Sequence, residues 1–495
     1  MRLLVDLRAR LASTIVFLCL AIAAPASAET WLRTETPRFV LYSNGGEQTL
    51  RDYAERLELL DATFWEVYGL PRPPPPPRKL PIYLVNDISG LRTVAPKLLG
   101  TAVGFYSADA GETFAMALAR RGNDYVLLHE YVHHLTFQNF PFGYPAWFVE
   151  GYAEYFMTTT VDESDIKVGL ASGRAEGLTF ETWLPMQDVL SKRVGEIPYA
   201  QRETFYAQSW LLTHYLVSDP KRAQQLQAYL TAIGKGEDSV AAMEAATGVK
   251  ADAWQRRLLA YLKGQTPYVQ FKKTQFPQTK VEVTRLTPVV SALLLDDLHV
   301  RSGVGAEAKA PLLAAIREKA GQYPEEPFAQ LALARAEIDL GDPMAAAPIL
   351  RKQLTANPRD VEALALQAGL LMALGDKTPP KRIDYYNQAG SVLAAAFKLD
   401  PGRYQTLLAF AHSRIVESNY PSDNTLTALL TTVKLAPQVG AARLEAANAL
   451  VARGRDRDAI VILTPLANSP HESDEAKLAR EMLAKIGSPK QPPKP

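Results

Sequence analysis

Residues 125–157 read YVLLHEYVHHLTFQNFPFGYPAWFVEGYAEYFM, which predicts two helices separated by a break that contains proline and glycine. His129 and His133 are four residues apart, so they project from one face of the first helix. Glu150 and Glu154 have the same spacing and share a face of the second helix. The stretch therefore supplies two imidazoles from one helix and two carboxylates from the next.

The H-E-x-x-H pattern at 129–133 is typical of helices that hold a zinc ion. His129 and His133 would bind through their ring nitrogens, and Glu150 would supply a third, carboxylate ligand. Three protein ligands and one open position describe a catalytic site, whereas a structural site closes its fourth position with protein, usually a thiolate. We therefore expect Zn²⁺ here, although the same ligands suit other divalent ions too.

The remaining polar side chains of the two helices have distinct expected roles. Glu130 stands one step round the first helix, where we expect it to act as the general base toward the attacking water. Glu154, one turn beyond Glu150, is expected to hold a ligand histidine in its correct tautomer; a solvated position and replacement of Glu150 as ligand are the alternatives. His134 points about 100° away from the second ligand histidine and is expected to be a surface or hydrogen-bonded residue.

The first 28 residues have the three parts of a secretory signal peptide. Three arginines precede an apolar run at about 15–24, and Ala26-Ser27-Ala28 forms an A-x-A cleavage site. The run is well short of the ~20 residues that span a bilayer, which argues against the alternative of a membrane anchor. We expect cleavage after Ala28 and a mature bacterial protein that is periplasmic or secreted, with no stable membrane insertion.

Composition limits the kinds of partner and of metal ligand that the mature protein can have. The chain of 495 residues has a net charge of +1, which gives no sign of a nucleic-acid partner. Its single cysteine, Cys19, lies inside the expected signal peptide and follows Leu18, where lipidation requires a small residue. The mature protein therefore has no disulfide, and a metal site in it must use His, Asp and Glu.

The rest of the chain divides into an α+β part and an all-α part. Strands are expected at 38–43, 80–85, 104–106 and 113–118, and helices at 203–217, 221–233, 238–246 and 251–263. We expect a catalytic domain over 29–265 and a linker over 266–304, in which Val281–Leu286 has the pattern of a strand.

From about residue 305 the sequence becomes rich in Ala and Leu and repeats itself. Gly341-Asp342 and Gly375-Asp376 are 34 residues apart, as are the prolines at 324 and 358, and further prolines follow at 401, 437 and 470. This period predicts tetratricopeptide-like repeats over 305–487, with a generic helical bundle as the alternative because the usual aromatic landmarks are mostly missing. Residues 488–495 are expected to be a disordered tail.

The string Trp-Phe-Val-Glu-Gly-Tyr-Ala-Glu at 147–154, together with His-Glu-Tyr-Val-His-His at 129–134, resembles the motifs of gluzincin metallopeptidases of the peptidase MA clan. The bacterial peptidase MA-like family is the most similar, and the resemblance covers roughly 35–265. It implies an α+β zincin-like catalytic domain, here followed by an all-α helical-repeat (tetratricopeptide-like) domain, with Glu150 as the third zinc ligand. It also implies that Tyr206 donates a hydrogen bond to the tetrahedral intermediate; a buried aromatic residue is the alternative.

Two departures from the clan bear on the substrate. The Gly-Ala-Met-Glu-Asn signature, with which the clan's aminopeptidases capture a free amino terminus, is absent, and the spacing from His133 to Glu150 is slightly shorter than in those enzymes. We therefore expect an exported zinc endopeptidase acting on a peptide or protein, with the repeats recruiting substrate or an envelope protein partner. A non-enzymatic envelope scaffold with a relic zinc site and a zinc hydrolase acting on a non-peptide bond remain alternatives.

Overall fold

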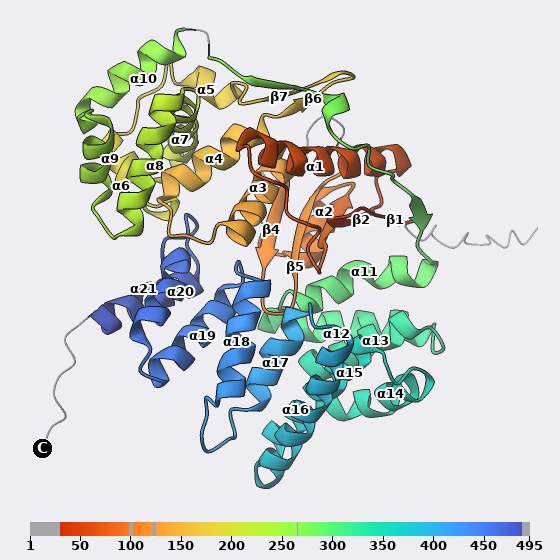
Figure 1. The fold of residues 1–495 in the computed structure, drawn as a ribbon. Helices are drawn as coiled ribbons and strands as arrows, with labels where there is room; N and C mark the ends of the chain where they lie inside the picture. Colours follow the sequence, from red (N-terminus) through yellow and green to blue (C-terminus); the bar gives the residue numbers. More distant parts are fainter. Residues whose placement is uncertain (1–29, 99–101, 121–124, 265, 488–495) are drawn as a thin grey trace, which may run out of the picture.

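The computed structural model describes residues 30–98, 102–120, 125–264 and 266–487 as a mixed sheet region followed by a helical, repeat-like region (Figure 1). The expected signal peptide (1–28) and C-terminal tail (488–495) lie outside these residues. Within the described part of the chain, no helix is both long enough and apolar enough to cross a membrane.

A six-stranded mixed sheet, in the order β4-β5-β3-β2-β1-β9, forms the core of the first half. Its strands are β1 (Leu32–Glu35), β2 (Phe39–Ser43), β3 (Leu80–Val85), β4 (Gly104–Ala108), β5 (Thr113–Leu118) and β9 (Val283–Arg285). Strands β2, β3 and β5 run parallel, and β4, β1 and β9 pair antiparallel with their neighbours. The four strands expected ahead of the motif helix are all present.

Side chains of β3 alternate between the two faces of this sheet, as the period of two requires. Ile82 and Leu84 pack with α1 (Glu47–Val67), whereas Tyr83 and Val85 pack with α2 (Ile88–Val94) and α11 (Pro288–Arg301). Figure 1 shows α1 lying across one face of the sheet. The first half is therefore layered as helix, sheet and helix.

Residues 266–304, expected as a linker, contribute three elements to the first half. Strand β8 (Val269–Lys272) joins a small sheet with β6 (Thr160–Val161) and β7 (Asp165–Val168). Residues 283–285, inside the strand expected at 281–286, form β9 and pair with β1 at the edge of the main sheet. Helix α11 then covers a sheet face, so this segment belongs to the structure of the first half.

Eight helices follow β5 in the described part of the first half before β8. They are α3 (Tyr125–Asn139), α4 (Ala146–Met157), α5 (Gly173–Gly177), α6 (Met186–Ser191), α7 (Arg202–Val217), α8 (Pro220–Gly234), α9 (Ser239–Thr247) and α10 (Trp254–Leu262). The last four match the four helices expected after residue 200, apart from small differences at their ends. Helix α4 packs between α3 and α7.

Helices α12–α21 form the second half, and each of them contacts the next helix along the chain. They are α12 (Ala306–Gly321), α13 (Pro327–Leu340), α14 (Pro343–Ala356), α15 (Val361–Lys377), α16 (Arg382–Leu399), α17 (Tyr404–Ser413), α18 (Asp423–Leu435), α19 (Gly440–Ala452), α20 (Asp456–Ala467) and α21 (Asp474–Gly487). The prolines at 324, 358, 401, 437 and 470 lie in the turns before α13, α15, α17, α19 and α21. Helices α11, α13, α15 and α17 also contact one another in that order. The second half is thus a repeat-like array of two-helix units.

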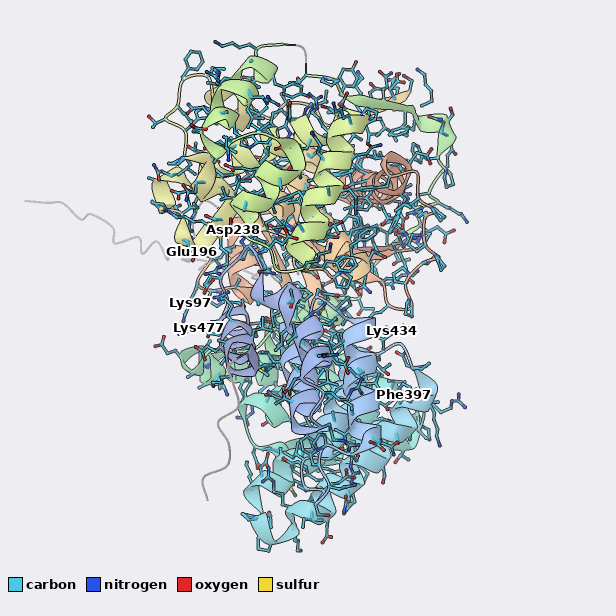
Figure 2. The ribbon with its side chains drawn as sticks, turned by 60° about the vertical axis from the view of Figure 1, so that its left-hand side comes forward. Lys97, Glu196, Asp238, Phe397, Lys434 and Lys477 are labelled. Carbon is cyan, nitrogen blue, oxygen red and sulfur yellow. The ribbon has the colours of Figure 1, made fainter. Side chains whose placement is uncertain are left out.

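The far end of this array turns back onto the first half. The hydroxyl of Tyr404 on α17 donates to the carbonyl oxygen of Asp109 at 2.8 Å. On α3, the side-chain amide of Gln138 donates to the carbonyl oxygen of Leu435 at 3.4 Å. In Figure 2, the C-terminal helices, with Lys434 labelled, lie directly against the first half. The array therefore contacts the helix that carries the H-E-x-x-H motif.

A buried ionic cluster also joins the two halves. Asp297 of α11 is 5 % exposed, and its carboxylate accepts hydrogen bonds from Arg301 at 2.7 Å and from Arg335 of α13 at 2.9 Å. Arg301 lies 3.7 Å from Glu112 in the β4–β5 hairpin and 3.2 Å from Glu362 of α15. Burial favours the neutral form of Asp297, but the two arginines outweigh it and hold the pKa of this carboxyl below its ordinary value.

We predict that Asp297→Asn lowers the free energy of unfolding by about 3 kcal/mol, because it removes the carboxylate that accepts hydrogen bonds from both buried arginines. Glu325→Gln removes an exposed ion pair with Lys352 and should change the same quantity by less than about 1 kcal/mol. Urea unfolding followed by circular dichroism measures both variants.

The stability difference should also depend on pH. Since the pKa of Asp297 is lowered in the folded protein, its stabilising charge is fully present above the ordinary aspartate value of about 4 and is lost as the pH falls through the folded value. The gap between wild type and Asp297→Asn should be largest near neutral pH and shrink on acidification. A gap that stays constant down to about pH 2 would contradict this assignment.

Candidate metal centre

Helix α3 carries the two histidines of the motif. The side chains of Leu127, Leu128, Val132 and Leu135 are buried in the core of the first half. This packing sets the rotation of the helix, so His129 and His133, one turn apart, both face α4. Helix α4 is buried at every position from Ala146 to Met157, which places its two glutamates inside the protein.

Gly151 allows α4 to approach α7 closely. A Cβ atom at this position would lie 2.2 Å from the carbonyl oxygen of Ser209 and 2.4 Å from Oγ1 of Thr213, both on α7. A larger residue would push the two helices apart. The glycine beside Glu150 is therefore what lets α7 bring Tyr206 close to the histidines.

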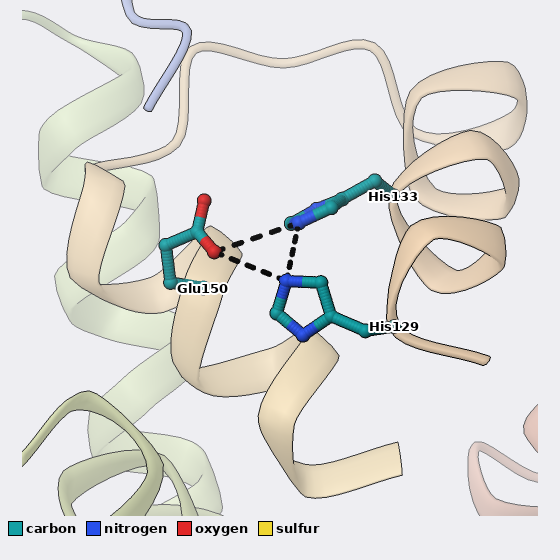
Figure 3. A group of neighbouring side chains, drawn as sticks. All are labelled: His129, His133 and Glu150. Carbon is teal, nitrogen blue, oxygen red and sulfur yellow. Dashed lines mark hydrogen bonds and ion pairs between the residues drawn. The ribbon is translucent and has the colours of Figure 1, made fainter. Parts of the chain in front are cut away.

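Three donor atoms converge between α3 and α4, as Figure 3 shows. Nε2 of His129 and Nε2 of His133 are 3.0 Å apart, and they lie 3.3 Å and 3.5 Å from Oε2 of Glu150. Ligand atoms bound at ~2.1 Å to a tetrahedral zinc ion lie roughly 3.4 Å from one another. The three spacings therefore fit a single ion held by two imidazoles and one carboxylate.

Glu150 is fully buried, at 0 % exposure, and neither carboxylate oxygen makes a hydrogen bond with a described residue. A buried carboxylate without hydrogen bonds is costly, and a cation among the three donors would compensate its charge. Burial raises the pKa of Glu150, but the charges of His471 and His133 outweigh it and hold this pKa well below its ordinary value. Burial likewise opposes charging of His129, yet the contact with Glu150 raises the pKa of His129 to about 9. Both shifts indicate that the cluster stabilises positive charge.

Glu154 lies beside the ring nitrogen of His129 that faces away from the other donors. Oε1 of Glu154 is 3.6 Å from Nδ1 of His129, and the same oxygen accepts a hydrogen bond from Arg174 of α5. Burial raises the pKa of Glu154. The contact with His129 is too long for a hydrogen bond, and Glu154 is not part of the converging donor set found among the described residues.

Tyr206 of α7 lies near His129, on the side of the cluster where Arg174 lies. Its ring centroid is 6.4 Å from that of His129, and the guanidinium of Arg174 lies over its ring at 5.4 Å. Burial raises the pKa of Tyr206, and the negative charges of Glu150 and Glu154 raise it further. The phenol therefore keeps its proton at neutral pH and remains a hydrogen-bond donor.

A pocket of about 260 Å³ opens beside the donors. Glu130 and His133 line it from α3, together with Tyr106 of β4, and His471 lines it from the C-terminal array. Glu130 therefore faces the same space as a predicted ligand. His134 is not part of this group: its Nδ1 and the hydroxyl of Tyr106 are hydrogen-bonded at 2.9 Å, and burial lowers the pKa of His134 to about 4.

Two residues of the site were not expected from the sequence. Arg174 lies in a segment without a motif, and its Nε also donates to Glu203 at 2.5 Å. His471 lies in the turn between α20 and α21, with Nε2 3.2 Å from Oε1 of Glu150. The one sequence feature that could have indicated His471 is the scarcity of histidine, which occurs only seven times in the chain. A turn in a helical repeat does not require a histidine.

Comparisons with known proteins add little to this geometry. No family model matches the sequence, and no curated protein matches it. Among solved structures, the chain is similar to a thermophilic TPR protein of Thermus thermophilus, with 20 % identity and a TM-score of 0.31 over 36 % of this chain and 92 % of that one. A likeness at that score does not establish a shared fold, and the evidence for a repeat-like array is the contacts between its successive helices.

We predict that His129→Ala abolishes retention of zinc, because it removes one of three converging donors. The wild-type protein should keep one zinc ion per chain after dialysis, and the variant essentially none, as measured by elemental analysis. His412→Ala is the matched control, since that histidine pairs with Glu445 in the array, away from the cluster. Equal zinc in wild type and His129→Ala would refute the site.

Proposed function

We propose that this protein is an exported zinc metallopeptidase, with a zincin-like catalytic half of the gluzincin type and a tetratricopeptide-like half that recruits its substrate or an envelope partner. The observation that carries the proposal is the convergence of His129, His133 and Glu150 at the spacing of zinc ligands. Glu130 faces the pocket beside them, where a purely structural metal site would have no use for a general base.

The chain's own residues have defined tasks in peptide-bond hydrolysis. When bound, the zinc ion supplies Lewis-acid chemistry and activates water for attack at neutral pH. Glu130 accepts the proton of the attacking water and passes it to the leaving amine. Tyr206 donates its hydroxyl proton in a hydrogen bond to the oxyanion that develops on the scissile carbonyl. Glu154 lies 3.6 Å from Nδ1 of His129, and a hydrogen bond from that nitrogen, formed when the two groups move closer, would hold His129 in the tautomer that presents Nε2 to an ion.

An endopeptidase fits the site better than an aminopeptidase. A free amino terminus is a cation, and its capture needs a carboxylate in addition to the general base. Among the described residues that line the pocket beside the donors, Glu130 is the one carboxylate. This supports a substrate bound along its length rather than by its amino terminus.

We predict that Glu130→Gln lowers kcat for cleavage of a peptide mixture by about 10²–10⁴-fold while zinc content stays the same, because only the base is removed. The assay uses the mature chain, residues 29–495, with Glu163→Gln as the matched control at an exposed position. The control should cleave as the wild type does.

Two results would count against the peptidase. Cleavage that survives in Glu130→Gln would remove the base from the mechanism. A wild-type protein that binds zinc but cleaves nothing in the mixture would favour the non-enzymatic scaffold, in which the array does the work.

We predict that Tyr206→Phe lowers kcat by about 10²-fold with little change in KM or zinc content, since the lost hydrogen bond forms only in the transition state. Tyr199→Phe is the control: this tyrosine precedes α7, and its side chain is exposed. A loss of activity that is equal in both variants would assign Tyr206 a packing role instead.

A further inference from the structure

The turn between α20 and α21 brings a third imidazole to the candidate metal centre. Nε2 of His471 lies 3.2 Å from Oε1 of Glu150, and the His471 ring meets the ring of His133 edge-on at 5.8 Å between centroids. The contact joins residues that are more than 300 positions apart in the sequence.

His471 approaches the carboxylate from the side that the other two histidines leave free. Their Nε2 atoms are closest to Oε2 of Glu150, whereas His471 faces Oε1. Among the described residues, the donor atoms that lie within 4.8 Å of one another belong to His129, His133 and Glu150 alone. The geometry therefore makes His471 a partner of the ligand carboxylate and leaves it outside the converging donor set.

The turn that carries His471 is held against the first half. Glu472 lies 3.7 Å from Arg193 of the catalytic half and also pairs with Arg480 of α21. At the other end of the turn, Asn468 fits so closely over Gly143 that a Cβ atom there would lie 2.5 Å from its Nδ2. His471 thus reaches the metal centre from a turn that packs against the first half and contacts the loop between α3 and α4.

We propose that His471 is a positioning residue, contributed by the repeat array, whose 3.2 Å contact with Oε1 of Glu150 closes to an Nε2–H hydrogen bond when zinc binds and so orients this ligand. A buried ligand carboxylate needs a partner for its second oxygen, and such partners tune metal affinity strongly. The inference rests on the proposed zinc site. The role of His471 adds a condition: the site is complete only while the turn between α20 and α21 packs against the catalytic half.

Seating of the array and binding of zinc are then linked. If docking of α20 and α21 tightens zinc binding, zinc must favour docking by the same factor, since coupling between two equilibria is reciprocal. A partner protein that pulled the end of the array away would loosen the metal. The array would thus act on catalysis directly, beyond its role in recruitment.

The test measures zinc affinity of the full mature chain by competition with a chromophoric chelator, without any assay of cleavage. We expect His471→Ala to weaken zinc binding by about 10–100-fold. His471→Gln should restore most of the affinity, because the side-chain amide can donate from the same position but is a poor zinc ligand. His412→Ala, in the exposed pair with Glu445, should bind zinc as the wild type does.

A second variant and a second readout keep the result independent of folding defects. Glu472→Ala leaves His471 in place but removes the ion pairs of the turn, and we expect an intermediate loss of zinc affinity. Hydrogen exchange of residues 468–473 should slow when zinc is added to the wild type and should respond less in His471→Ala. Unchanged exchange in the wild type would overturn the linkage.

The outcomes separate the two proposals. Wild-type protein that binds no zinc would overturn the proposed function itself. If His471→Ala binds zinc with the same affinity as the wild type, the role of His471 is overturned and the proposed function is not. A third outcome is that His471→Gln binds zinc as weakly as His471→Ala and that the cobalt-substituted variants differ from wild type in their absorption spectra. That outcome would make His471 a direct ligand and overturn the positioning role.

Discussion

A carboxylate without exposed surface dominates the energetics of this protein's centre. Glu150 has no hydrogen bond to a described residue, and three imidazoles surround it. Burying such a charge is tolerable only if positive charge lies beside it. Helix α3 supplies two histidines that can carry this charge, and the C-terminal array supplies a third imidazole. Helix α4 carries the carboxylate itself, and Gly151 lets α7 pack closely against α4.

The same constraint explains why the two halves are not independent. Helical repeats usually contact only their neighbours, so an array can extend away from the domain that carries it. Here α11 packs on the sheet through Leu294 and Leu298 and on the array through Leu293 and Val300. The array then bends back until its last turn lies over the pocket. A catalytic half cut at residue 265 would lose a strand of each sheet, a covering helix and one wall of the site.

The elements that sequence reasoning predicted are those whose signal is local. Short, largely apolar runs at 80–85 and 113–118 predict two inner strands, and the proline period predicts the turns between two-helix units. For residues 266–304 the sequence predicts a linker with one strand at 281–286, whereas the structure pairs two short strands of this segment with partners more than a hundred residues away. A local pattern can indicate a strand, but it does not indicate which distant strand it pairs with.

For the centre itself, the sequence alone determined the pair His129 and His133, the neighbouring Glu130 and the two glutamates of the next helix, because helical periodicity converts a spacing of four into a shared face. Only the tertiary structure decided that Oε2 of Glu150 meets both imidazoles, that Arg174 holds Glu154, and that His471 reaches Oε1. These contacts depend on how whole helices pack, and packing is set by the summed burial of many side chains rather than by any short motif.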